Sequence, residues 1–169
     1  MAWETIHRTE SELESIRQHR EQAHQALTEA RAMLAAAEAH WGALQARGAQ
    51  DPSVAERVAD LQQRVQALEA ILEQATPSAF VEALEAATSV AALGTSVTGE
   101  LDAFESLMEQ SGQALAASQR LLDDAQGRMA ELQQSLPLFV LDESAAAIAD
   151  ARRTLEEAAN LVAAGTWHG

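Results

Sequence analysis

Two Glu-x-x-His pairs are the part of this sequence whose residue types and spacing come closest to a chemical site. They are Glu4 with His7 and Glu21 with His24. On a helix this spacing puts both side chains on one face, and in di-iron bundles such pairs from different helices meet. Here both pairs lie in one predicted helix, about 25 Å apart along its axis. We therefore predict no metal site and no cofactor, and a metal-binding helical bundle is the least favoured of three interpretations.

The composition removes most other catalytic chemistry. The chain has 169 residues, of which 38 are alanine, and it contains no lysine, cysteine or tyrosine. Without cysteine there is no thiol catalysis, disulfide or zinc ribbon, and without lysine no Schiff base or P-loop lysine. The sequence also has no glycine-rich phosphate loop and no nucleophile elbow. We predict that the protein is not an enzyme.

The chain is acidic, and its acidity is uneven. Asp and Glu number 26 against 11 arginines, a formal net charge of −15, and the second half carries about two thirds of the excess. This balance disfavours direct binding to nucleic acid, because each phosphate contact needs a cation. The run Asp102, Glu105 and Glu109 could instead imitate a phosphate backbone for a basic partner protein. The simpler reading is a solvated face that keeps an alanine-rich bundle in solution.

A heptad repeat is the strongest structural signal. One heptad position holds Ile6, Leu13, Arg20, Leu27, Leu34 and Trp41, and its partner holds Thr9, Ile16, Ala23, Ala30, Ala37 and Leu44. Ten of these twelve residues are apolar, and the register never slips. The pattern predicts one helix over residues 3–46, about 66 Å long. We call this stripe the seam.

Capping residues predict where this helix ends and others begin. Gly48 suits a helix C-terminus, and Asp51 with Pro52 suits the start of a second helix. That helix carries apolar residues from Val54 to Ala75 at alternating spacings of four and three. The pair Thr76-Pro77 repeats the capping pattern, so we expect the chain to kink or restart there.

Beyond this point the predicted stripe weakens and then returns. Residues 78–93 are helical by composition, so that 54–93 forms one kinked rod, and 94–99 is predicted as a loop, with a distorted helix as the alternative. The heptad resumes over 100–136 and stops at Pro137. A last helix starts at Asp142 or Ser144 and ends before Gly165.

Two features are candidate partner-binding sites. Arg20 interrupts the seam, where it either pairs with an acid of another helix or lies exposed with its head in water. The connector after Pro137 is apolar, with Leu138, Phe139 and Val140 in place of a polar loop. It is either a docking patch or a cover folded over the end of the bundle, and we favour the cover.

These patterns together predict an all-α protein, an elongated antiparallel coiled-coil-like bundle of four to five helices. We expect one domain over residues 1–169, with a long hairpin at 3–93 and a second helix pair at 100–164. The expected function is a non-enzymatic structural or adaptor role through helix–helix contacts with another protein or a second copy of the chain. The alternative is an acidic inhibitor of a nucleic-acid-binding protein. We expect no signal peptide, no membrane span and a cytoplasmic location.

Overall fold

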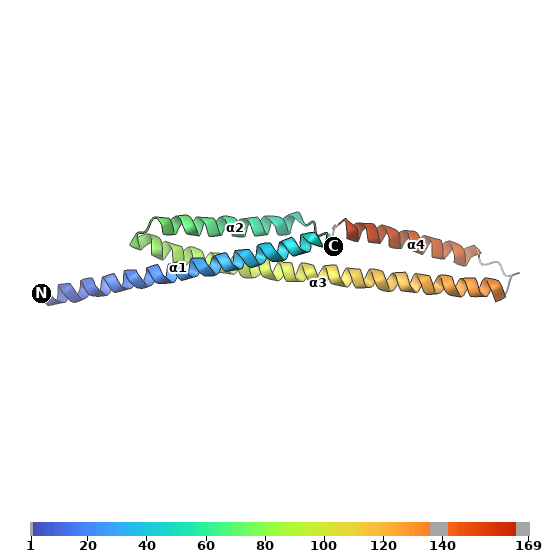
Figure 1. Ribbon diagram of the computed structural model, residues 1–169, viewed down its shortest axis with the longest axis horizontal. Helices are drawn as coiled ribbons and strands as arrows, with labels where there is room; N and C mark the ends of the chain where they lie inside the picture. The colour runs from blue at the N-terminus through green and yellow to red at the C-terminus, as the bar shows by residue number, and fades with distance from the viewer. Residues whose placement is uncertain (1, 136–141, 165–169) are drawn as a thin grey trace. The chain divides into compact units, whose positions relative to one another are not determined.

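The computed structural model describes residues 2–135 and 142–164, and nearly all of these residues lie in helices (Figure 1). The helices of the described ranges are α1 (Ala2–Ala46), α2 (Pro52–Glu73), α3 (Pro77–Ser135) and α4 (Asp142–Ala163). No strand occurs in those ranges. The predicted all-α class is confirmed, as are the helices predicted over 3–46 and from Asp142.

By their contacts the residues divide into two compact units. The first contains Met1–Ala43 and Pro52–Asp102, and the second contains Leu44–Asp51 and Ala103–Gly169. Helix α3 contributes to both units, and the division within it falls after Asp102. We expected a single domain over residues 1–169. Whether the two units fold as one domain stays a prediction.

The end of α1 is closed by the glycine that the sequence singled out. Gly48 has a φ of 97°, a left-handed conformation that glycine adopts without steric cost. The backbone N–H of Ala49 then donates to the carbonyl of Leu44 at 3.0 Å, and that of Gly48 to Gln45 at 2.9 Å. These two bonds satisfy carbonyls that the helix end would otherwise leave unpaired. Helix α2 begins at Pro52, as predicted.

At Thr76-Pro77 the chain restarts as a new helix. Helix α2 ends at Glu73, α3 begins at Pro77, and the Thr76 hydroxyl accepts a hydrogen bond from the Ala79 N–H at 3.2 Å. The prediction of one kinked rod over 54–93 is therefore wrong. Ala75, expected on the apolar stripe of α2, is exposed in the turn with a φ of 52°.

The first unit is built around one shared core. Its three helices all contribute buried apolar side chains, and α2 alone buries six. Contacts join each pair of helices: Arg31 of α1 is bonded to Glu69 of α2 at 2.6 Å, Arg64 of α2 is bonded to Ser89 of α3 at 3.0 Å, and Gly94 of α3 lies against Met33 of α1. The buried apolar side chains of α3 here are those of Ala79, Phe80, Ala83, Ala87, Val90, Val97 and Leu101. The unit is thus a three-helix assembly in which each helix covers the other two.

The predicted loop at 94–99 is wrong, because α3 continues through it as helix. Gly94 is buried, and a Cβ at this position would lie 3.0 Å from Sδ of Met33 in α1. The glycine therefore makes room for a neighbouring helix. The hydroxyls of Thr95 and Thr98 donate to carbonyls one turn earlier, at 3.0 and 2.9 Å, so these polar residues are accommodated within the helix.

The second unit buries far less. Its buried apolar residues among those described are Leu44, Ala49, Phe104 and Leu122. Helix α4 lies along the later part of α3 but buries no residue, although it has the same length as α2 (Figure 1). The apolar stripes of this helix pair therefore remain largely open.

One stretch of α3 has the composition of a membrane span. An 18-residue window of this helix reaches a mean hydropathy of 1.2, and 28% of the window is buried. One such helix among the described residues is weak evidence for a span, since helices packed in a protein core have the same composition. The expectation that the chain does not cross a membrane stays a prediction.

Candidate protein-interaction surface

A groove runs between α3 and α4 in the second unit. It has a volume of about 680 Å³. Its lining contains no charged residue and consists of Ser118, Leu121, Leu122, Ala125, Ala147, Ile148, Ala151, Thr154, Leu155 and Ala158. We call it the α3–α4 groove.

Helical periodicity explains how these residues come together. On α4 the lining residues recur at spacings of three and four, so they share one face, and on α3 they occupy two successive turns. In the first unit such faces are covered by a third helix. The described part of the second unit contains no third long helix. Helix α2 and all but the last residues of α1 belong to the first unit.

Large apolar side chains continue this surface beyond the groove. Several leucines of the second unit are exposed, with fractions of 43% at Leu107, 72% at Leu121, 50% at Leu132 and 60% at Leu161. Leu107 and Leu121 are 14 residues apart, which is two heptads, so they lie on the same side of α3. Exposed apolar patches of this kind are typical of interaction sites.

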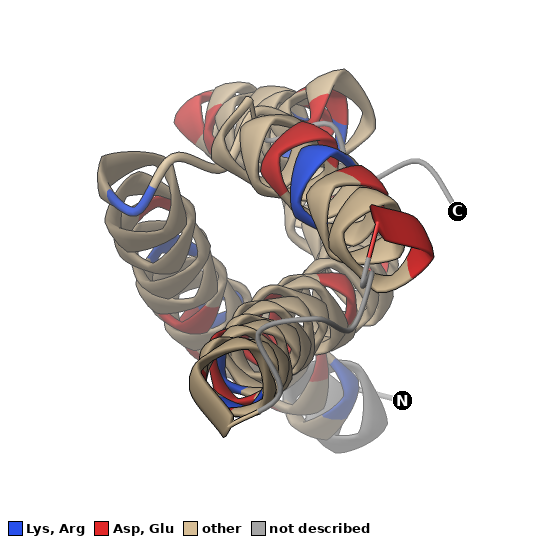
Figure 2. Ribbon diagram, turned by 90° about the vertical axis from the view of Figure 1, so that its right-hand side faces the viewer, with Lys and Arg blue, Asp and Glu red and all other residues tan. Residues whose placement is uncertain are grey.

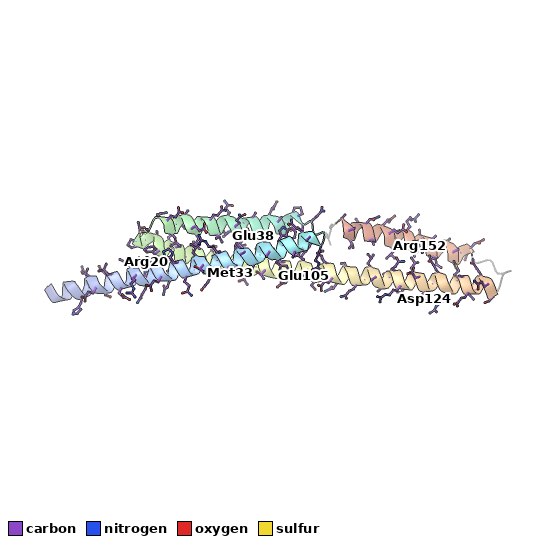
Figure 3. The ribbon with its side chains drawn as sticks, in the orientation of Figure 1. Arg20, Met33, Glu38, Glu105, Asp124 and Arg152 are labelled. Atoms are coloured by element: carbon purple, nitrogen blue, oxygen red, sulfur yellow. The ribbon has the colours of Figure 1, made fainter. Side chains whose placement is uncertain are left out.

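Helix α1 carries a second, smaller open surface at Arg20. This residue is exposed, and it lines a pocket of about 370 Å³ with Leu13, Ile16, Arg17, Ala75 and Phe80. Leu13 is 62% exposed. No ion pair of Arg20 occurs with the described residues, whereas its neighbour Arg17 pairs with Glu21 at 3.2 Å. Arg20, labelled in Figure 3, is exposed, and which of its two predicted roles it has stays a prediction.

The predicted acidic run is engaged within the chain. In the first unit, the Asp102 carboxylate lies 3.8 Å from Nδ1 of His40. In the second unit, Arg47 pairs with Glu105 and lies 3.8 Å from Glu109. Each of these three carboxylates thus has a basic neighbour, which reduces the field that an isolated acidic stripe would present.

Charges of both signs are interspersed along the helices (Figure 2). Most ion pairs join exposed side chains one turn apart, such as Asp60 with Arg64 at 3.2 Å and Asp124 with Arg128 at 2.9 Å. Pairs of this kind contribute little to stability, because water and salt screen them. The second unit also has a contact between helices, in which Arg152 of α4 donates to Gln126 of α3 at 2.7 Å.

The Glu-x-x-His residues have ordinary structural neighbours. His24 lies with its ring centroid 6.5 Å from that of Phe80, and Glu21 accepts a hydrogen bond from Arg17. His7 lies 3.3 Å from Glu10. Among the described residues no three His, Asp or Glu side chains converge in the way that a metal ion requires. The proposed connector residues Leu138, Phe139 and Val140 lie outside the described residues.

Sequence reasoning did not single out the α3–α4 groove. The heptads predicted over 100–136 and in the last helix contain Leu122, Ala125, Ile148 and Leu155, and they were expected to extend beyond what one short fourth helix covers, but no groove between the two helices was predicted. A usable signal was present in Leu107 and Leu121, which lie beside the stripe and widen it.

Comparison of the chain with protein-family models, with curated proteins and with solved structures finds no match.

Proposed function

We propose that this protein is a non-enzymatic structural or adaptor protein that acts through helix–helix contacts with another protein chain. The observation that carries the proposal is the uncharged α3–α4 groove with its exposed leucines. Burying such a surface releases water from apolar area, which is the main driving force for association. An amphipathic helix is the partner shape that fits a groove between two helices.

The same proposal includes the finer architecture. We propose that neighbouring helices pack antiparallel in the manner of a coiled coil. The supporting observations are the short connections on either side of α2 and the spacing of the buried residues Val54, Val58, Leu61, Val65, Leu68 and Leu72. Such packing makes rigid surfaces, which suits a protein whose role is to hold partners.

The alternative function, an acidic inhibitor that imitates nucleic acid, has less support. It requires carboxylates that are free to meet a basic partner. Asp102, Glu105 and Glu109 have His40 or Arg47 as neighbours. No observation on the described residues favours this function over the apolar groove.

Photo-crosslinking tests the proposed function. A photoreactive aromatic amino acid replaces Leu121 in the full chain, which is then expressed and irradiated in its native cells. We expect a crosslinked product larger than one chain on a denaturing gel, whose partner, either a different protein or a second copy, is identified by mass spectrometry. The matched control places the same amino acid at Ala116, which is exposed on the opposite side of α3 and should give no such product. Crosslinks only within the same chain would contradict the proposal.

A further inference from the structure

The seam of α1 is covered over only part of its length. Between residues 23 and 41 it contributes Ala23, Leu27, Ala30, Ala37 and Trp41 to the buried residues of the first unit. Contacts of this region reach both neighbouring helices of the first unit, since Arg31 bonds to Glu69 of α2 and Met33 lies against Gly94 of α3. This part of the seam therefore lies against a layer of two helices.

The same seam continues toward the N-terminus with little cover, since among the described residues outside α1 only Ala75 and Phe80 line a pocket with it there. Over residues 7–22 the helix and its heptad register continue, but no residue is buried. Leu13 and Arg20 are exposed and Ile16 is only half-buried. The face of α1 that packs on two helices over residues 23–41 is therefore mostly exposed over residues 7–22, where the heptad register is the same.

The α3–α4 groove offers the matching surface. It is a layer of two helices, like the layer of α2 and α3, but in the described residues of its unit no third helix covers it. The lengths agree as well. On α4 the groove extends from Ala147 to Ala158, and the open seam extends from Thr9 to Arg20, so that each covers 12 residues or about 17 Å of helix.

Charge favours the exposed part of the α1 seam over a second α3–α4 pair as the segment that binds in the groove. Residues 103–163 contain ten acidic residues and four arginines, so two such pairs facing each other would bring together two strongly acidic units. Residues 7–22 contain four acidic residues and three arginines, close to neutral. Arg20 has no ion pair with the described residues and would bring a positive charge to the acidic unit. Like charges in an interface oppose association, whereas complementary charges favour it.

From these observations we propose that the N-terminal part of α1, residues 7–22, docks in the α3–α4 groove of a second copy of the chain. Leu13 and Ile16 are its apolar anchors, and the docked segment makes the second unit a three-helix assembly like the first. This inference rests on the proposed function and names the partner. Because the two surfaces differ, the contact joins unlike faces and can link chains in series or close reciprocally.

Single substitutions test each surface separately. Leu13→Glu disrupts the inserted segment and Leu121→Glu disrupts the groove, and both side chains are mostly exposed, so the fold is kept. We expect sedimentation velocity to show self-association of the unmodified chain at micromolar concentrations and a loss of about tenfold or more in affinity for each variant. The controls Ser11→Glu and Ala116→Glu add the same charge on the opposite helix faces and should associate normally. Circular dichroism checks helix content, and Leu13→Gln and Leu121→Gln replace any variant that unfolds.

Mixing the two defective variants gives the decisive result. At a concentration where each variant alone is monomeric, the mixture retains one intact α1 segment and one intact groove, so native mass spectrometry should show a 1:1 complex and nothing larger. A monomeric unmodified chain overturns the inference. Association that survives Leu13→Glu but not Leu121→Glu also overturns it, because the groove would then bind another groove.

The outcomes separate this inference from the proposed function. If the chain is monomeric but the crosslink from position 121 identifies a different protein, the inference fails and the proposed function stands. If the chain is monomeric and no crosslink to another chain forms, both fail. If self-association follows the expected pattern, both are supported.

Discussion

At the scale of single residues, Gly94 shows why a glycine in a helical protein is ambiguous. Glycine near threonine and serine is typical of a loop, yet here α3 continues and the missing side chain leaves space for Met33. The glycine has a packing role that depends on another helix. Nothing in the residues around it identifies that helix.

This role predicts opposite outcomes at the two glycines of the segment. Gly94→Leu should lower the free energy of unfolding by about 1–3 kcal/mol, because the added side chain overpacks the contact with Met33. Gly99→Ala should raise it by about 1 kcal/mol, because a Cβ on this exposed helical glycine would meet nothing within 4 Å and alanine favours the helix. Urea denaturation measures both. Equal effects at the two positions would contradict the packing role.

Ala75 is a residue whose backbone conformation suits glycine better. Its φ of 52° lies in the left-handed region, which costs a non-glycine residue about 1–2 kcal/mol. Ala75→Gly should therefore stabilise the protein by about 1 kcal/mol in urea denaturation. Ala70→Gly, at an exposed interior position of α2, is the matched control and should destabilise by a similar amount. A loss of stability at position 75 would show that the turn is not strained.

At the scale of elements, α2 and α4 form a natural comparison. Each has 22 residues, but α2 buries six side chains and α4 buries none. Most helix stability in proteins comes from tertiary packing of an apolar face rather than from intrinsic propensity. The two helices should therefore differ in local stability although both are rich in good helix formers.

Hydrogen exchange checks this difference. In dilute solution the backbone amides of α4 should exchange faster than those of α2, because opening α4 exposes little additional apolar surface. If a second copy covers the α3–α4 groove, protection of α4 should rise with protein concentration while that of α2 stays constant. Equal protection of the two helices in dilute solution would mean that α4 is stabilised by contacts other than those described.

At the scale of the whole molecule, the question is whether apolar contact or charge drives association. The chain has a net charge of −15, but the α3–α4 groove is uncharged. An association driven by apolar burial is insensitive to salt or strengthens with it, whereas one driven by charge weakens, since ions screen exposed charges.

Salt therefore separates the two functions considered for this protein. Self-association of the purified chain, followed by sedimentation, should not weaken as sodium chloride is raised from low to high concentration. A strong decrease would favour the acidic surface as the binding element. Leu121→Glu serves as the reference, because its self-association should be weaker than that of the unmodified chain at every salt concentration.

The helical class, the ends of α1 and α4, and the break at Thr76-Pro77 could all be predicted from the sequence. These features depend on capping residues and on the heptad repeat, both of which can be recognised from residues close together in the sequence. Three features follow only from the packing of distant helices: α3 continues through Gly94, Asp102 and Glu105 lie near His40 and Arg47 respectively, and the seam is buried at residues 23–41 but mostly exposed at 7–22. Each of these depends on which distant helix lies opposite, and a heptad pattern records that a face is apolar without recording what packs against it.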